Sequence, residues 1–358
     1  METIPDEIMI NITASLPTGD LGRFRLASRR CAETGLPVMA RQLRVLNTVT
    51  CLQNFNQFLT TIPAVYTRAL TIYHSKWPIF SHGEWQTHPL LLREKVPHSG
   101  LSAPGSLASS AVLQEYQEFL SRDDERRYHS DLEIVAEILG RLPNLLTVTI
   151  ETLQPWGRVP GPNPWTSPTF NTAMNRMVRC VIHSLHKRPR VHTLDIRGKT
   201  PQAVLLECPI PTTITTLRIK SLVGGPLAPS NTPLLIPGHA SLRVLEVNCP
   251  ARPRLVFLPN PLPELQALYL QGCVVQEESL VSLYSTPALC RMHLSNITLT
   301  KGTWASCLSR MRAISHQPSL ELSGIFDGHD LLCSQFYVQS TTLGLLQDFM
   351  DSKIPWPF

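Results

Sequence analysis

The sequence predicts an α/β protein with two parts, a helical unit at the N-terminus and a longer repeat domain built around a parallel sheet. Two observations support this prediction. The first fifty residues hold aliphatic side chains at helical spacing, interrupted by Pro17 and Gly35. The rest of the chain holds six copies of one aliphatic pattern at nearly constant spacing, which is the mark of a repeat architecture.

The N-terminal unit is expected to contain three short helices. Ile8, Ile12 and Leu16 recur at every fourth residue, which predicts one apolar stripe on a first helix. Pro17 ends this helix, and a second one is expected between residues 18 and 31.

A third helix is expected from Leu36 through Leu43 and Val45. Three helices in fewer than fifty residues bury little surface. The unit is therefore expected to need a partner for its remaining apolar face, either another protein or the rest of this chain.

The repeated pattern is L-x-x-L-x-L, with other aliphatic residues allowed. Its copies begin at Leu145, Val191, Ile214, Leu242, Leu265 and Leu289. Successive copies start 46, 23, 28, 23 and 24 residues apart, the first interval being two periods. Partial copies occur at Leu70 and Leu320. Each copy predicts a short strand whose fourth and sixth residues point into the core.

The segments between the copies are expected to differ from one another. Apolar stripes predict helices from Leu132 to Leu142, from Met174 to Leu185 and from Trp304 to Ile314. The connections at residues 224–237 and 250–263 are too rich in proline for helices. The expected result is an irregular horseshoe, with a parallel sheet on its concave side and mixed helices and loops outside.

The domain boundaries follow from these patterns. Residues 1–47 are assigned to the helical unit, and residues 48–130 to linker helices, a first strand and a loop insertion at Pro97–Ser109. The repeat domain takes residues 131–345, and a C-terminal tail takes residues 346–358.

Three motifs follow one another within the first thirty residues: Ile4-Pro5-Asp6-Glu7-Ile8, then Leu16-Pro17-Thr18-Gly19-Asp20-Leu21, then Arg25-Leu26-Ala27-Ser28-Arg29-Arg30. Their order and spacing resemble the F-box, a family that opens with Leu-Pro-x-Glu-Ile, continues with Leu-Pro-x-x-Asp-Leu and closes on a Ser/Asn-Arg-Arg segment. Ile4 replaces the usual leucine, and Cys31 stands where an aromatic residue is common.

The resemblance implies that the helical unit docks on a Skp-family linker protein, and through it on a cullin ubiquitin ligase. By position in the motifs, the implied linker-binding residues are Pro5, Ile8, Ile12, Leu16, Pro17 and Leu21. Leu26 is expected to support them. The alternative is that these residues only close an internal three-helix core.

The resemblance extends to F-box proteins with divergent leucine-rich repeats. It includes the segments Leu70-Thr71-Ile72-Tyr73-His74, Trp85-x-x-His88-Pro89-Leu90 and Leu299-Thr300-Lys301-Gly302-Thr303-Trp304. The expected architecture is therefore a three-helix F-box followed by an irregular leucine-rich-repeat-like horseshoe.

A target protein is expected to bind the concave face of the sheet. In each strand, the third, fifth and seventh residues of the pattern face outward. The candidate target-binding residues at these places are Arg197, Arg218, Lys220, Glu246 and Tyr269. A charged groove with an aromatic anchor suits protein recognition, although an ordinary solvated sheet face has the same composition.

Composition and motifs predict an intracellular protein without a catalytic residue, a metal site or a cofactor. Charged residues make up 16% of the chain, its formal net charge is +5, and no run of five basic residues favours nucleic acid. No segment is apolar enough to predict a membrane span. Nine separated cysteines suit a reducing compartment, either cytoplasmic or nuclear. The cluster Cys180, His183, His186 is expected to be a plain helix face.

These observations leave four functions open. The first is a substrate-recognition adaptor of an SCF-type (Skp-cullin-F-box) ubiquitin ligase. The second is an F-box scaffold without a role in degradation, and the third is a plain repeat-containing protein-binding module. An enzyme is the last, because no motif gathers converging titratable groups.

Overall fold

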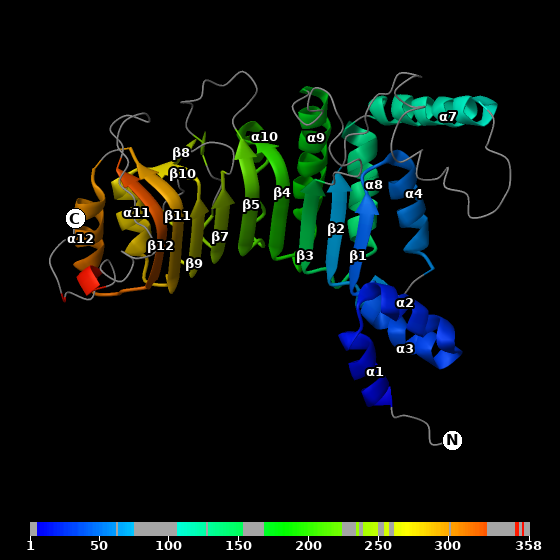
Figure 1. Ribbon diagram of the computed structural model, residues 1–358, viewed down its shortest axis with the longest axis horizontal. Helices are drawn as coiled ribbons and strands as arrows, with labels where there is room; N and C mark the ends of the chain where they lie inside the picture. The colour runs from blue at the N-terminus through cyan, green and yellow to red at the C-terminus, as the bar shows by residue number, and fades with distance from the viewer. Residues whose placement is uncertain are drawn as a thin grey trace.

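Parallel strands side by side in one sheet form the body of the molecule (Figure 1). The computed structural model describes residues 6–61, 64–74, 106–126, 128–152, 168–223, 234–235, 239–249, 254–257, 261–300, 302–327, 348–350 and 353. Pro5, Trp85 and the tail beyond residue 353 lie outside these residues, as do most of the predicted loop insertion and most of the two proline-rich connections.

The sheet follows chain order along most of its length, as β1-β2-β3-β4-β5-β7-β9-β11, and β12 adds to β11. A second row, β10-β8-β6, joins the C-terminal half of β11. The strands are β1 (Gln42–Leu46), β2 (Ala69–His74), β3 (Thr147–Thr152), β4 (Thr193–Pro201), β5 (Thr216–Val223), β6 (Leu234–Leu235), β7 (Val244–Asn248), β8 (Arg254–Phe257), β9 (Ala267–Gln271), β10 (Cys273–Val275), β11 (Arg291–Leu299) and β12 (Ser319–Asp327).

The repeated pattern sets the register of this sheet. The third residue of each copy pairs with the third residue of the next, so that Thr147, Thr193 and Thr216 lie side by side. The same register continues through Val244 to Ala267. The predicted α/β class and its parallel sheet are confirmed, with the partial copies forming β2 and β12.

The helices of the repeat region lie along one face of the sheet, and α1, α2 and α3 project beyond the amino end of β1 (Figure 1). The helices are α1 (Asp6–Ser15), α2 (Thr18–Ala27), α3 (Arg29–Ala40), α4 (Val49–Phe58), the 3₁₀-helix η1 (Ala64–Tyr66), α7 (Ser106–Asp124), α8 (Tyr128–Gly140), α9 (Pro168–Leu185), α10 (Gln202–Glu207), α11 (Glu277–Tyr284) and α12 (Trp304–Arg312).

One continuous hydrophobic core lies between the sheet and the helices α4, α8, α9, α10, α11 and α12. The fourth and sixth residues of the copies, such as Leu194 and Ile196, are completely buried. The predicted helical stripes meet them from the other side: Val135 and Leu139 on α8, and Met311 on α12, are at most 1% exposed. Fully burying such a side chain contributes about 1.5–3 kcal/mol, which makes this core the main source of stability.

Several predicted boundaries of the elements were wrong. The third helix ends at Ala40, and residues 42–46, which include Leu43 and Val45, form β1 instead. The reason is tertiary: β1 pairs with β2 along its whole length. The second helix ends at Ala27, because the side chain of Ser28 caps α3 through the amide of Cys31.

Two further observations concern segments to which the sequence assigned no helix or strand. The proline-rich connections contain the short strands β6 and β8 where the structure describes them. Residues 106–109, expected in the loop insertion, begin α7. Among the described helices, none combines the length and the apolar character that a membrane crossing requires.

Gly272 makes the turn between β9 and β10 and provides a test of this packing. Its φ is +64°, and a Cβ atom built there would lie 2.5 Å from the carbonyl oxygen of Cys249. We expect Gly272→Ala to lower the free energy of unfolding by about 1–3 kcal/mol, through backbone strain and this clash. Urea unfolding followed by circular dichroism measures the change.

Gly22→Ala is the matched control, because Gly22 lies within α2 and has no atom within 4 Å of the built Cβ. Alanine is the better helix former there, so this variant should be about as stable as the parent or up to about 1 kcal/mol more stable. Equal effects of the two substitutions would contradict the packing described for the β9–β10 turn.

Candidate functional site

The helical unit exposes apolar side chains on α1 and α2. Among the described side chains of α1, Met9 and Thr13 are buried where the helix packs against α3. Ile8 and Ile12, one turn apart, are 50% and 40% exposed, and Leu26 near the end of α2 is 87% exposed. A face of this kind on a helix outside the main core is typical of a protein-interaction site.

The other implied linker-binding residues have different positions. Leu16 is half-buried and Pro17 is exposed at the start of α2. Leu21 is only 3% exposed, so in this conformation its side chain packs inside the helical unit. Gly35 permits this burial, because α2 lies close to α3 there: a Cβ at Gly35 would lie 2.7 Å from Cγ of Arg25 and 3.4 Å from the side chain of Leu21.

The five predicted target-binding residues lie on consecutive strands, on the face of the sheet away from the helices. The register places Arg197 beside Lys220, and Glu246 between Arg218 and Tyr269. The structure therefore brings together all five residues that the pattern singled out. We call this surface, formed by the outward residues of β3 to β12, the open face.

Ion pairs between neighbouring strands cross the open face. The carboxylate of Glu246 lies 3.3 Å from Nε of Arg218 and 3.6 Å from Nζ of Lys220. Arg197 lies 2.7 Å from the buried carboxylate of Asp195, and this hydrogen bond raises the pKa of Arg197. Because opposite charges lie beside one another on neighbouring strands, the face suits a partner that is polar but has no large net charge.

Aromatic and titratable side chains continue the open face toward β12. The ring centroids of Tyr269 and His293 are 6.2 Å apart. Nδ1 of His293 lies 2.9 Å from Glu321, and Arg291 donates to the hydroxyl group of Tyr269 at 3.5 Å. Tyr269 is half-buried among these neighbours, which limit the movement of its ring.

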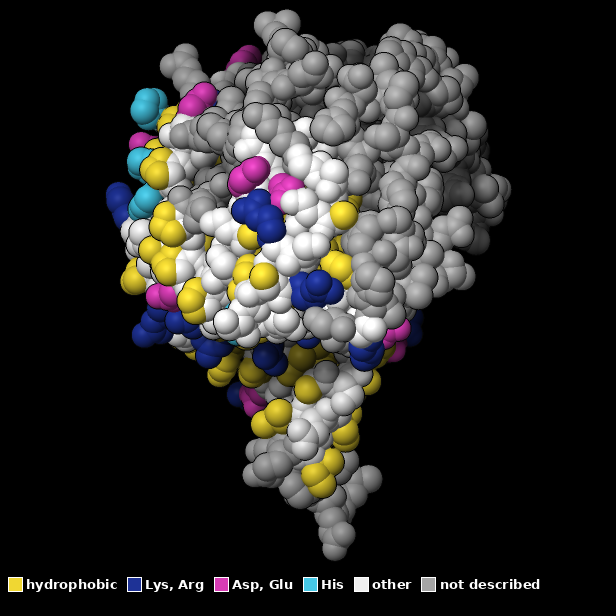
Figure 2. All heavy atoms as spheres, turned by 90° about the vertical axis from the view of Figure 1, so that its left-hand side faces the viewer, with side chains coloured by type: hydrophobic (Ala, Val, Ile, Leu, Met, Phe, Trp, Pro, Cys, Tyr) yellow, Lys and Arg dark blue, Asp and Glu magenta, His cyan; other side chains and the backbone are white. Residues whose placement is uncertain are grey.

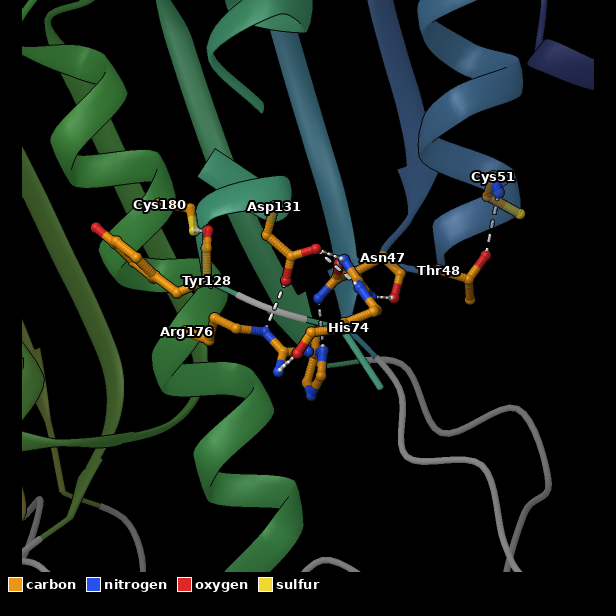
Figure 3. A network of polar contacts seen from close by, with 9 residues as sticks. Asn47, Thr48, Cys51, His74, Tyr128, Asp131, Arg176 and Cys180 are labelled. Atoms are coloured by element: carbon orange, nitrogen blue, oxygen red, sulfur yellow. Dashed lines mark hydrogen bonds and ion pairs between the residues drawn. The ribbon is translucent and has the colours of Figure 1, made fainter. Parts of the chain in front are cut away.

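A cluster of buried polar side chains lies at the carboxyl ends of β1 and β2 (Figure 3). Arg126, between α7 and α8, donates from Nη1 and Nη2 to the carbonyl and side-chain oxygens of Asn47, at 2.9 and 2.7 Å. Its Nε lies 2.9 Å from Asp131, whose other oxygen lies 2.6 Å from Nε of Arg176. These contacts link α8, α9 and the end of β1.

His74 is the titratable member of this cluster. Since Arg126 donates to the side-chain oxygen of Asn47, the amide nitrogen of Asn47 faces Nδ1 of His74 and donates to it at 2.9 Å. Burial, together with the positive charges of Arg126 and Arg176, lowers the pKa of His74 to about 3. The imidazole is therefore neutral at physiological pH.

The sequence interpretation missed this cluster. Its members come from four separate segments and follow no periodicity. The available signal was weak: Asn47 and His74 are polar residues directly after or at the end of an aliphatic strand, where parallel strands commonly place functional groups. In the structure these side chains bind one another, which makes the cluster a connection between elements.

Cys180, His183 and His186 do not converge on a common point. Cys180 is buried, and its thiol faces the carbonyl oxygen of Tyr128 at 3.8 Å. Burial raises the pKa of this thiol to about 12. His183 is exposed, and Nε2 of His186 lies 3.0 Å from the carbonyl oxygen of Pro209.

Comparison with known proteins gives no family: none of the protein-family models matches this chain, and no curated protein matches it significantly.

The neutral state of His74 gives a prediction about pH. The unfolded chain binds a proton at this imidazole below about pH 6.5, whereas the folded chain does not until about pH 3. Between these values the unfolded state holds one more proton, so the free energy of unfolding falls as the pH falls.

We expect His74→Gln to remove this part of the pH dependence. Between pH 6 and pH 4.5, unfolding free energies from urea titrations should fall more steeply in the parent, by up to about 1.4 kcal/mol per pH unit. Parallel curves for the two proteins would contradict a buried neutral His74.

Proposed function

We propose that this chain is a substrate-recognition adaptor of an SCF-type ubiquitin ligase. In this proposal α1–α3 are an F-box that docks on a Skp-family linker protein, which connects to a cullin. The strands with the repeated pattern are divergent leucine-rich repeats, and their open face binds a target protein.

The observation that carries the proposal is the exposed apolar surface of α1 and α2. Ile8 and Ile12 belong to motifs that resemble the F-box in order and spacing, and they are half-exposed although the chain has a large core elsewhere. Leu26, in the third motif, is exposed further still. Leaving such side chains in water is unfavourable, and a linker protein on this face would bury them.

The repeat region supports the second half of the proposal. Each copy of the pattern forms a parallel strand in register with its neighbours, as stacked repeats do. The outward side chains form a continuous charged surface with Tyr269 as an aromatic anchor, and such residues are enriched where proteins bind proteins.

The mechanism in this proposal is proximity. The chain itself transfers nothing, since ubiquitin chemistry belongs to the ligase's partner enzymes. One end holds the ligase and the open face holds the target, so that transfer between them becomes effectively intramolecular. A rigid sheet between the two surfaces suits this role, because their separation stays fixed.

The double variant Ile8→Asp, Ile12→Asp tests docking. Both side chains are exposed in the free chain, so folding should be preserved, while binding would bury two unpaired carboxylates at several kcal/mol each. We expect the affinity for a purified Skp-family linker to fall at least about 100-fold, as measured by isothermal titration calorimetry.

Ile10→Asp is the matched control, because Ile10 is 51% exposed and lies about 160° to 200° around α1 from Ile8 and Ile12. Its affinity for the linker should stay within a few-fold of the parent. Failure of the intact chain to bind the linker, or equal loss in both variants, would contradict the proposed docking face.

Target binding is tested in cells by the double variant Lys220→Ala, Tyr269→Ala, with Arg243→Ala as a control away from the open face. Some proteins should become more abundant when the chain is depleted from cells. Their abundance, measured by quantitative proteomics, should return to its original level when the parent or the control is expressed, but not when the double variant is expressed. If a cullin-ligase inhibitor does not make the same proteins accumulate in cells that contain the parent chain, the scaffold function is favoured instead.

A further inference from the structure

Three arginines without a carboxylate partner among the described residues form a basic group at the amino edge of the sheet, close to the helical unit. Arg41 and Arg68 directly precede β1 and β2, and Arg190 precedes β4. The amide of Arg68 donates to the carbonyl oxygen of Arg41 at 2.9 Å. All three side chains are exposed.

Asn144 holds two of these arginines in place. Its carbonyl oxygen accepts from Nη1 of Arg68 at 3.2 Å, and its side-chain oxygen accepts from Nη1 of Arg190 at 2.7 Å. Its amide nitrogen donates to the carbonyl oxygen of Val65 at 2.8 Å. Anchored guanidinium groups lose less side-chain entropy when they bind a partner.

These arginines differ from other cations at the same edge. Arg243, which directly precedes β7, lies 3.3 Å from the carboxylate of Glu264. By contrast, no carboxylate among the described residues lies within 4 Å of the side chains of Arg41, Arg68 or Arg190. Arg41, Arg68 and Arg190 can therefore pair with carboxylates of another molecule.

Exposed apolar side chains lie beside the arginines. Val65 and Tyr66 in η1 are 49% and 41% exposed, and Asn144 connects η1 to the arginines. We call Arg41, Val65, Tyr66, Arg68 and Arg190 the edge surface. A mixture of arginine, tyrosine and aliphatic side chains is typical of protein interfaces, whereas a nucleic-acid site would be expected to have a longer basic stripe.

The edge surface continues from the helical unit. The η1 segment contacts α3, and Thr67 donates to the carbonyl oxygen of Ala40 at the end of that helix. Figure 2 shows lysine and arginine side chains along the lower rim of the sheet domain, seen from its C-terminal end. Because η1 contacts α3, and α1 and α2 pack on α3, a protein seated on α1 and α2 would lie close to the edge surface.

We propose that the edge surface binds an acidic segment of the same partner that docks on α1. This inference rests on the proposed function and deepens it, because it assigns to the partner a second contact with a stated charge. Carboxylates of that segment pair with the three arginines, and the ring of Tyr66 supplies the apolar contact. Two contacts on one partner also fix the orientation of the sheet relative to the ligase.

The test is the triple variant Arg41→Glu, Arg68→Glu, Arg190→Glu of the full-length chain, titrated with the purified Skp-family linker. We expect its affinity to fall about 10- to 100-fold at low salt. The loss should shrink as the salt concentration rises, because exposed charges are screened. Tyr66→Ala should weaken binding about three- to ten-fold at every salt concentration.

The matched control is Arg122→Glu, Arg243→Glu, Arg291→Glu, which changes the net charge equally at sites away from the edge surface. It should keep the affinity of the parent within a few-fold. Equal losses of affinity in the two triple variants would overturn the inference, because they would show that only the net charge of the chain attracts the linker.

The remaining outcomes separate this inference from the proposed function. Full affinity in the edge variant, with loss in Ile8→Asp, Ile12→Asp, would overturn the inference alone. No binding by the intact chain would overturn both. Tight binding of a labelled single-stranded RNA oligonucleotide at physiological salt, lost in the edge variant, would assign the edge surface to nucleic acid and overturn the protein partner.

Discussion

The constraint on which the structure depends is that no repeat can bury its own aliphatic side chains. Each copy of the pattern supplies a first, fourth and sixth residue, such as Leu242, Leu245 and Val247, that are at most 1% exposed. One strand and its connection cannot shield these residues, so they are covered by the neighbouring copies and by the helices behind them. The sheet is therefore stable only as a stack, and its register follows from the spacing of the copies.

The same constraint separates the core from the surfaces that can bind partners. In each strand, one set of alternating side chains packs in the core, and the other set, which includes the charged and aromatic residues, points to the opposite face of the sheet. The helical unit stands outside this arrangement: α1 and α2 pack on α3, and α3 meets the sheet through β1 and η1. Its exposed apolar side chains are not needed to cover the core of the stack, which the repeats and their helices already bury. The buried cluster around Arg126 connects the helices of the first repeats.

The sequence predicted the parts of the fold that depend on local periodicity. The aliphatic copies identified their strands, and the alternation within each strand placed Arg197, Arg218 and Tyr269 on one surface. Features that depend on tertiary contacts were not predictable in this way. Residues 42–46 suit a helix or a strand, and pairing with β2 decided between them. The burial of Leu21 depends on the close approach that Gly35 permits, and the cluster around His74 joins segments far apart in the chain.

Hydrogen exchange of the full-length chain, with and without a saturating Skp-family linker, tests the central claim most directly. The account predicts slower exchange of the backbone amides in α1 and α2 on addition of the linker, because a docked partner suppresses local opening of these helices. Exchange in the strands of the open face should stay unchanged, since the proposed function assigns that face to the target and not to the linker. Unchanged exchange in α1 and α2, or protection confined to the open face, would contradict the account.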